Sequence, residues 1–242
     1  MRLLIPRGGE IGPHADGWGA AFYEGSAARI FKEPRPASES RCLRFISEYD
    51  YQSEIVVAHI RRANPPQYGR TSANTHPFER EWRGQSWVFA HNGKLPGIRE
   101  QFPKITRFRP MGDTDSEYAF CLLLNRLAEC RSEKLTQNVL DKTLSPRIIK
   151  LAALDEFNFL LSNGIFLIAF AHTKLHMVQR ECLDAEGCQQ LVTLLATTPL
   201  TDESWVRLSN GSLYIYQGGE LSVQKNIVAT ALPESDQLVI EK

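Results

Sequence analysis

The chain has 242 residues, of which 43% are hydrophobic and 23% are charged, an ordinary composition for a globular protein. Its 28 basic and 28 acidic side chains cancel, so the net charge at pH 7 is zero. That balance gives no electrostatic reason to expect a nucleic acid or an anionic membrane as partner. The sequence has no apolar run of the roughly 20 residues that a membrane helix needs, and no signal-peptide pattern at its start. We expect a cytoplasmic protein with one domain over residues 1–242.

The five cysteines are scattered along the chain: Cys42, Cys121, Cys130, Cys182 and Cys188. They form no C-x-x-C pair, so the sequence gives no support for a structural zinc site or a redox motif. We expect free thiols in a reducing cytosol, with neither a metal ion nor a cofactor.

The first part of the chain predicts short strands around one helix. Three segments have apolar patterns typical of strands: Trp18–Tyr23, Ala28–Lys32 and Glu54–Ile60. Between the second and third of these segments, Ser38 or Ser40 can cap a short helix.

The stretch 63–83 is rich in Pro, Gly, Asn, Thr and Arg. We expect a long surface loop there, and long loops in compact domains are often functional. A strand over Trp87–Ala90 should follow and end in a turn at Asn92-Gly93.

Two helices are predicted in the middle of the chain. Thr114 followed by Glu117 has the spacing of a capping box, and leucines then recur at helical intervals. The polar segment 131–143 should separate this helix from a second one, which Ser145 would cap with Pro146 at its first position.

Beyond Phe157 the pattern changes to strands. The expected strands are Phe159–Leu161, Ile165–Ala171, Leu175–Arg180, Leu191–Thr197, Leu213–Tyr216 and Leu221–Val223. Asn163-Gly164 between the first two is the strongest hairpin signal in the chain. Strands, then two helices, then more strands joined by hairpins predict an α+β fold with antiparallel sheets.

Four short motifs bring together side chains that could form a binding site: Ala58–Asn64, Asn74–Phe78, Phe89–Gly93 and Gly112–Glu117. They supply a guanidinium at a strand end, an Asn-Gly turn with free backbone donors, and a carboxylate at a helix start. Taken singly, each has a plainer explanation, because a strand-end arginine can be solvated, and acidic residues favour helix N-termini for electrostatic reasons alone. His59, His76 and His91 could suggest a metal site, but their spacing matches no metal motif, and we expect core histidines.

Preceded by His14–Gly19, which contains Asp-Gly-Trp-Gly, the four motifs occur in an order that resembles the class II glutamine amidotransferases. Within that family the stand-alone type is the most similar. The resemblance implies the four-layer αββα sandwich of two antiparallel sheets of the N-terminal-nucleophile hydrolases. It also implies that the ligand is glutamine or another γ-glutamyl small molecule, whose side-chain amide the family cleaves.

The resemblance assigns the principal roles residue by residue. Arg61 matches the arginine that binds the α-carboxylate, a role that suits a planar and permanently charged guanidinium. Asp115 matches the aspartate that binds the α-ammonium. The Asn92 side chain and the Gly93 N–H match the pair that forms the oxyanion hole.

Three further residues carry roles by the same resemblance. Asn64 and His76 fall in substrate-binding motifs, and Arg7 matches an arginine that supports the nucleophile.

The family nucleophile is a cysteine at the mature N-terminus, whose own α-amine acts as base. This chain begins Met1-Arg2-Leu3, and six residues precede Arg7, too few for the strand that carries that cysteine. We therefore expect the first strand of the fold to be missing. Cys42 lies between Arg41 and Arg44, which could lower its thiol pKa, but it stands outside the motifs, and we do not expect it to substitute.

Three hypotheses remain open. The full gene product could be a γ-glutamyl amide hydrolase whose cysteine lies upstream of Met1. The chain could instead be a catalytically inactive module that binds glutamine or a γ-glutamyl compound, as a subunit beside a partner subunit. It could also be a degraded remnant that folds poorly.

Overall fold

A computed structural model describes residues 5–49, 51–63, 69–183 and 187–228. Within them, the strands form three antiparallel sheets. The first sheet has the order β2-β1-β3 and consists of β1 (Gly17–Glu24), β2 (Ala27–Glu33) and β3 (Val56–Arg61). The second has the order β10-β8-β9 and consists of β8 (His176–Leu183), β9 (Gln189–Ala196) and β10 (Val206–Arg207).

The third sheet has six strands in the order β12-β11-β7-β6-β5-β4. Its strands are β4 (Phe78–Trp82), β5 (Gln85–Gly93), β6 (Phe157–Ser162), β7 (Leu167–Ala171), β11 (Ser212–Gln217) and β12 (Glu220–Asn226). The described α-helices are α1 (Arg41–Glu48), α2 (Ile98–Gln101), α3 (Asp115–Ala128) and α4 (Gln137–Ala152).

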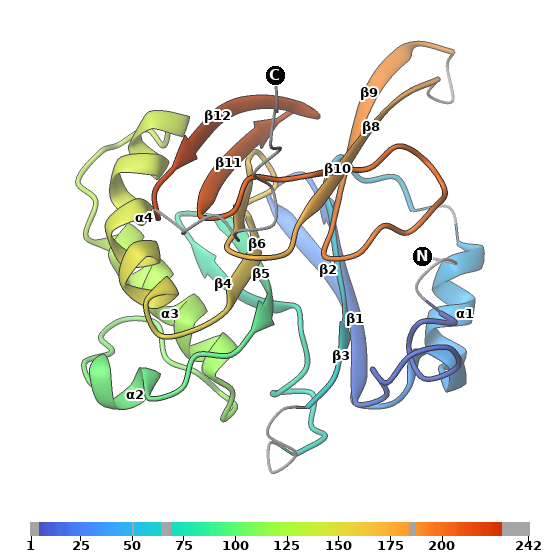
Figure 1. Cartoon of the computed structure of the whole chain (residues 1–242), viewed down its shortest axis with the longest axis horizontal. Helices are drawn as coiled ribbons and strands as arrows, with labels where there is room; N and C mark the ends of the chain where they lie inside the picture. Colours follow the sequence, from blue (N-terminus) through green and yellow to red (C-terminus); the bar gives the residue numbers. More distant parts are fainter. Residues whose placement is uncertain (1–4, 50, 64–68, 184–186, 229–242) are drawn as a thin grey trace, which may run out of the picture.

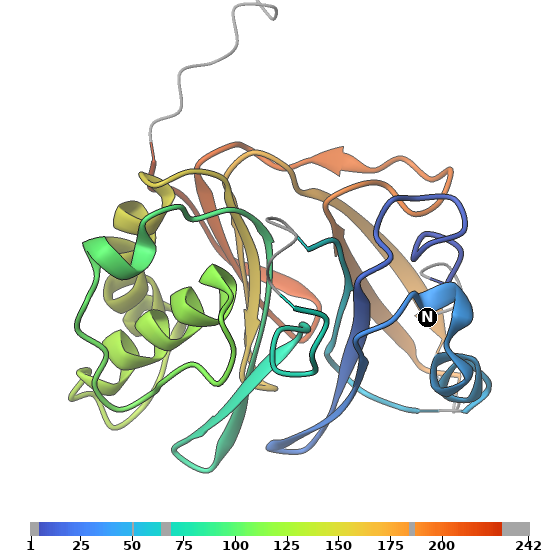
Figure 2. The same ribbon diagram turned by 90° about the horizontal axis from the view of Figure 1, so that it is seen from below.

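These elements form four layers (Figures 1 and 2). Helices α3 and α4 cover one face of the six-stranded sheet, and the two three-stranded sheets lie against its other face. Helix α1 covers the outer face of the β2-β1-β3 sheet. The expected αββα sandwich is thereby confirmed, with its second β layer divided into two separate sheets.

The largest part of the core lies between the six-stranded sheet and the two long helices. Phe89 of β5 and Phe120 of α3 are fully buried, and their rings stack with centroids 5.3 Å apart. Between the two β layers the side chains are smaller, with Ala21 and Val57 facing Ala90. The Tyr23 hydroxyl lies within hydrogen-bonding distance of a β6 carbonyl, which ties the first sheet to the six-stranded sheet.

Helix α4 differs from the prediction because it begins at Gln137, with Thr136 as its cap, and carries Pro146 inside it. A proline inside a helix removes a backbone hydrogen bond and costs about 3 kcal/mol. Burial of Leu140 and Leu144, both with no exposed surface, offsets that cost, since a buried leucine side chain contributes about 1.5–3 kcal/mol.

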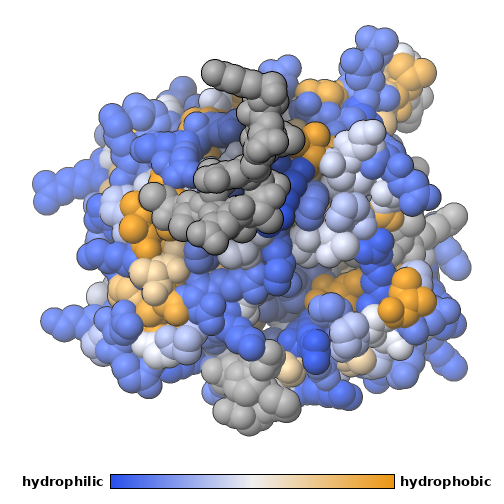
Figure 3. Space-filling model, viewed as in Figure 1, coloured by the Kyte–Doolittle hydropathy of each residue, from blue (hydrophilic) through white to orange (hydrophobic). Residues whose placement is uncertain are grey.

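The expected loop over 63–83 is also wrong at its end, because Phe78–Trp82 forms strand β4. Its partner β5 runs to Gly93, so Asn92-Gly93 closes a strand and is not a hairpin turn. No helix within the described residues is long and apolar enough to cross a membrane. The face of the molecule in Figure 3 is mostly hydrophilic, with its hydrophobic residues in small separate groups.

Candidate functional site

A cavity of about 260 Å³ lies where β3, β5 and the N-terminus of α3 meet. Its lining includes five residues that the sequence predicts for the site: Arg61, His76, Asn92, Gly93 and Asp115. The motifs thus converge although up to 54 residues of sequence separate them. Asn64, the other predicted substrate-binding residue, lies outside the described residues.

Arg61 is the last residue of β3, and 3% of its surface is exposed. Its Nη1 donates to the Asp16 carbonyl at 3.3 Å. The Asp16 carboxylate in turn accepts a hydrogen bond from the Ala63 N–H at 2.8 Å and pairs with Arg70 at 2.7 Å. Burial lowers the pKa of Arg61, but a guanidinium keeps its charge in proteins. Asp16, noted in the sequence only as part of a motif, therefore orders the segment around the arginine.

Gly93 can offer a free N–H because of its place in the β-ladder. Lys94 N donates to the Glu156 carbonyl at 3.0 Å, so the even-numbered residues of this segment direct their backbone N–H and C=O groups toward β6. The N–H of Gly93, an odd-numbered residue, therefore points to the opposite edge of β5. On that edge pairing with β4 has already ended at Phe89. The φ of Gly93 is +149°, and a Cβ there would lie 1.8 Å from the Glu156 carbonyl oxygen. Only glycine fits this position.

Asp115 is held by two backbone donors. It is the first residue of α3, whose cap Thr114 accepts a hydrogen bond from Glu117 N. The Asp115 carboxylate accepts from Leu95 N at 2.7 Å and from Ser116 N at 2.8 Å. A carboxylate has about four acceptor positions, so this one retains capacity for a ligand ammonium.

Three histidines in the wall of the cavity are neutral. Burial lowers the pKa of His59 to about 3 and also lowers the pKa values of His76 and His91. His91 lies 2.9 Å from the Ser116 hydroxyl, and the ring of His76 lies against that of His59 at a tilt of 34°, with centroids 4.2 Å apart. Both His76 nitrogens lack a hydrogen-bond partner within the described residues. In the same residues, no group of three His, Cys, Asp or Glu side chains could hold a metal ion.

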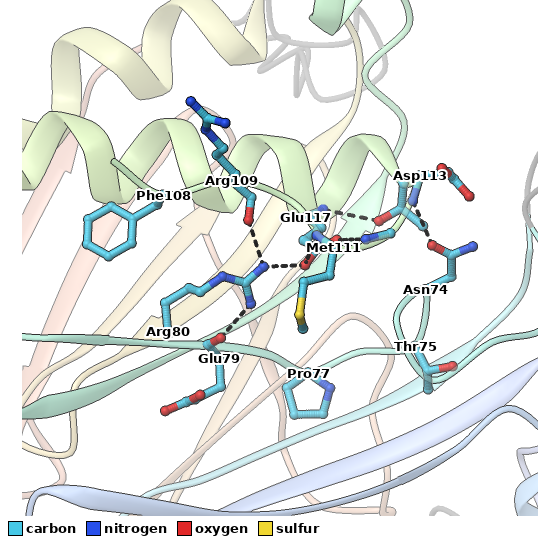
Figure 4. A network of polar contacts seen from close by, with 12 residues as sticks. Asn74, Thr75, Pro77, Glu79, Arg80, Phe108, Arg109, Met111, Asp113 and Glu117 are labelled. Carbon is cyan, nitrogen blue, oxygen red and sulfur yellow. Dashed lines mark hydrogen bonds and ion pairs between the residues drawn. The ribbon is translucent and has the colours of Figure 1, made fainter. Parts of the chain in front are cut away.

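The segment before α3 is fixed by a buried ion pair that the sequence did not reveal (Figure 4). The Glu117 carboxylate accepts from Arg80 at 2.5 Å and from the N–H groups of Met111 and Gly112 at 3.1 and 2.7 Å. In a capping box it would reach back to its own helix cap, so that part of the prediction is wrong. Asn74 also anchors this segment, because its side-chain oxygen accepts from Asp113 N at 2.8 Å.

A second cavity, of about 440 Å³, lies between strands β3 and β9. It shares with the first cavity five lining residues: His14, His59, Ile60, His91 and Asn92. The predicted nucleophile-supporting residue Arg7 also lines it, with a guanidinium that donates to the Pro199 carbonyl at 3.0 Å.

The strand edges beside this second cavity are unpaired in the described sheets. Asp16 N donates to the Arg61 carbonyl, and Tyr23 N donates to the Ile55 carbonyl. The odd-numbered residues of β3 therefore direct their backbone groups toward β1. The even-numbered residues Val56, Ala58 and Ile60 then direct their backbone groups to the other edge, and all three line the cavity. Strand β9, at the end of its own sheet, supplies part of the opposite wall.

The cysteines do not supply a thiol to either cavity, since none of those in the described residues is in their linings. Burial and the charge of Glu33 raise the pKa of Cys42, so the idea that its neighbouring arginines lower that pKa is wrong. Burial in the core raises the pKa of Cys121 to about 12. Neither thiol has the character of an activated nucleophile.

Two further charged residues in the cavity wall, Glu156 and Lys174, had no signal in the sequence. They lie just before β6 and just after β7, and pairing of those strands brings them together.

The chain is similar to known proteins over most of its length. The family model "Glutamine amidotransferases class-II" matches residues 1–237. The Escherichia coli (strain K12) protein "Putative glutamine amidotransferase YafJ" is 38% identical over 236 residues, which cover 90% of this chain and 91% of that protein. The crystal structure of a "predicted glutamine amidotransferase" from Pseudomonas aeruginosa is 37% identical and superposes with a TM-score of 0.71, over 90% of this chain and 91% of that one.

A more distant solved structure has the same fold. It is the glutamine phosphoribosylpyrophosphate amidotransferase from B. subtilis, which is 14% identical and has a TM-score of 0.61, over 95% of this chain and 45% of that one. Because the family model matches nearly the whole sequence, this chain belongs to the class II glutamine amidotransferase family.

Proposed function

We propose that the 260 Å³ cavity binds the γ-glutamyl group of glutamine or a γ-glutamyl amide, and that residues 1–242 form one domain for cleaving its side-chain amide. The observation that carries the proposal is the convergence of four groups in one cavity wall: the Arg61 guanidinium, the Asp115 carboxylate, the Asn92 side chain and the Gly93 N–H. Charges of both signs complement the two charges of an α-amino acid. The two neutral donors suit a carbonyl oxygen that becomes negative.

The proposed roles follow from charge and direction. Arg61 binds the α-carboxylate, because a guanidinium can donate two parallel hydrogen bonds to it. Asp115, kept in place by the Leu95 amide, binds the α-ammonium. Asn92 and Gly93 donate to the oxyanion that forms when a thiolate attacks the amide carbon. Removal of one such donor typically lowers the rate about 100- to 1000-fold.

The attacking thiol would enter on a strand that fills the 440 Å³ cavity. Its neighbours would be β3 and β9, whose free edges line that cavity, and its end would reach the substrate cavity through the shared lining at His59 and Asn92. The α-amine of an N-terminal cysteine would take the thiol proton and return it to the departing amine, and water would then release glutamate. Arg7, in the lining of this cavity, would support that cysteine.

A non-catalytic module that binds glutamine or a γ-glutamyl compound, with or without a partner subunit, is the second candidate. It is favoured by the cysteines themselves, since those in the described residues are absent from the lining of either cavity. We also propose a cytoplasmic location, which the free thiols of Cys42, Cys121, Cys130 and Cys182 support.

Ligand binding tests the pocket without requiring catalysis. Calorimetric titration of the 242-residue chain with L-glutamine should give a dissociation constant that rises at least about tenfold in Arg61→Gln, since a charged hydrogen bond is worth about 1.5–3 kcal/mol. Arg41→Gln is the matched control, because Arg41 is exposed and lies outside the linings of both cavities. Equal affinity of the two variants would contradict the assignment of Arg61.

Ammonia release separates the two candidates. We expect none from the 242-residue chain, since no residue in the described cavities combines a thiol with a free α-amine. A version extended upstream to an in-frame Met-Cys start should release ammonia if the chain belongs to an amidase. Activity of the 242-residue chain that Cys42→Ala abolishes would contradict the proposal and identify Cys42 as the nucleophile.

A further inference from the structure

Glu156 and Lys174 form an ion pair in the wall of the substrate cavity, with Nζ 2.9 Å from Oε1. Glu156 adjoins the oxyanion-hole residue Gly93, because its carbonyl accepts from the next amide, Lys94 N. Asp115 is fixed from the other end of the same short segment, through Leu95 N. The cavity wall therefore carries two sets of opposite charges, Arg61 with Asp115 and Lys174 with Glu156. The strand end at Asn92-Gly93 lies beside both sets.

The Glu156–Lys174 pair is held by a buried side chain. Asn158 has no exposed surface, and its Oδ1 accepts from Thr173 N at 2.8 Å and from Lys174 N at 2.9 Å. Its Nδ2 group lies within hydrogen-bonding distance of the Asn92 carbonyl, the Thr173 hydroxyl and Glu156 Oε1. One buried amide thus fixes both the oxyanion-hole strand and the turn that carries Lys174.

The carboxylate of Glu156 is fixed on one side and open on the other. Thr173 Oγ1, Lys174 Nζ and Asn158 Nδ2 all donate to Oε1, while Oε2 has no hydrogen bond or ion pair among the described residues. Although burial acts to raise it, these contacts hold the pKa of Glu156 below its ordinary value. A carboxylate that is charged at neutral pH, with one oxygen open and a lysine beside it, complements a second α-amino acid group.

The charged side chains in the cavity wall outnumber the two charges of glutamine. Four cations line it, Arg61, Arg62, Lys94 and Lys174, against two carboxylates, Asp115 and Glu156. The α-amino acid group of glutamine matches one cation and one carboxylate. Glutamine has no charge on its amide nitrogen and leaves the second pair without a ligand.

We propose, on the basis of the function proposed above, that the preferred ligand is a γ-glutamyl isopeptide whose amide nitrogen belongs to the side chain of a second α-amino acid. Arg61 and Asp115 hold the γ-glutamyl end, and the amide carbonyl lies at Asn92 and Gly93. The second α-amino acid group lies at the other pair, with its ammonium on Glu156 Oε2 and its carboxylate on Lys174. Hydrolysis would add water across the amide and release glutamate and the second amino acid.

Three probes that share the γ-glutamyl group test this proposal by calorimetry on the 242-residue chain: L-glutamine, γ-glutamyl butylamide and ε-(γ-glutamyl)lysine. The butylamide has an aliphatic amine side chain without the second pair of charges. We expect the isopeptide to bind at least about tenfold more tightly than the butylamide, the factor that corresponds to about 1.4 kcal/mol. Lys174→Met and Glu156→Gln should each reduce that preference.

The controls separate this inference from the proposed function. Lys150→Met, at an exposed position on α4, should change none of the three affinities. Equal binding of isopeptide and butylamide, with glutamine still bound through Arg61, would overturn the isopeptide proposal alone. Absence of binding by all three probes would overturn both proposals. If Glu156→Gln unfolds, Lys174→Met decides the outcome, because 57% of that lysine side chain is exposed.

Discussion

The Asp115 carboxylate accepts a hydrogen bond of 2.7 Å from the Leu95 amide, which links the start of α3 to the segment that follows Asn92 and Gly93. The same side chain therefore has a structural contact and a proposed contact with the ligand ammonium. These two roles can be separated by substitution.

Asp115→Asn should weaken glutamine binding at least about tenfold and lower thermal stability less than Asp115→Ala does. The amide oxygen can still accept from Leu95 N, but the negative charge for the ammonium is lost. Asp115→Ala should lose both properties. Asp113→Asn, two residues earlier and exposed, is the control for a general change in charge. Titration calorimetry and thermal unfolding of the three variants check this, and unchanged glutamine affinity in Asp115→Asn would exclude the ammonium role.

Gly93→Ala should destabilise the fold by more than about 3 kcal/mol, because a backbone clash and an unfavourable conformation add together. The new Cβ would lie 1.8 Å from the Glu156 carbonyl oxygen, at a φ of +149°. Gly84→Ala is the matched control, with φ +71° and no atom within 4 Å of the new Cβ. Urea unfolding of both variants measures the difference in the free energy of unfolding. Similar losses of stability in the two variants would mean that the backbone at Glu156 can shift at little cost.

Acidification should destabilise the protein through its buried histidines. A histidine with a depressed pKa stays neutral in the folded state, while the unfolded chain takes up a proton below its ordinary pKa of about 6.5. Their contribution is therefore complete above pH 6.5 and is lost as the pH falls toward the folded values, about 3 for His59.

For His59 alone the loss at pH 5 is roughly 2 kcal/mol, from 1.36 kcal/mol per pH unit. Urea unfolding at pH 7.5, 6 and 5 measures the slope, and His59→Gln should reduce it. A free energy of unfolding that stays constant over this range would show that His59, His76 and His91 are not neutralised by folding.

Arg80→Met should cost about 3–5 kcal/mol, because it leaves the fully buried Glu117 carboxylate without its cation. The exposed pair Arg29–Glu24, with 49% and 78% of the side chains accessible, is the control. Arg29→Met should cost less than about 1 kcal/mol. Chemical unfolding compares the two, and Arg80→Met,Glu117→Met should recover part of the loss if the unpaired charge is its cause.

The free edges of β3 and β9 should make the 242-residue chain poorly soluble and weakly cooperative in unfolding. A version extended upstream to a Met-Cys start should unfold sharply and at a higher temperature. Equal, sharp transitions in both versions would show that no strand is needed between these edges.

Much of the molecule was predictable from local sequence. Asn163-Gly164 specified the β6–β7 hairpin, and Thr114 specified the start of α3, because turns and caps depend on residues that are close in sequence. The ordered motifs around Arg61, Asn92 and Asp115 were sufficient for the family. They were also sufficient to name most of the residues that meet in the first cavity.

Contacts between distant segments decided the rest. Burial of Leu140 and Leu144 stabilises α4 through the region before Pro146, where the sequence predicts a polar connecting segment. Pairing with β6 turned Asn92-Gly93 from an expected turn into a strand end. Such outcomes depend on the free energy of burial and of ladder hydrogen bonds, and both are set only when the layers pack.

The charged groups show the same division. The sequence by itself determined that Arg61 and Asp115 stand at element ends, and through their motifs it determined the family. Only the tertiary structure placed Glu156 and Lys174 in the same cavity and paired Arg80 with Glu117. The strength of an ion pair depends on the distance between its charges and on their burial. The sequence specifies neither of these until the chain is folded.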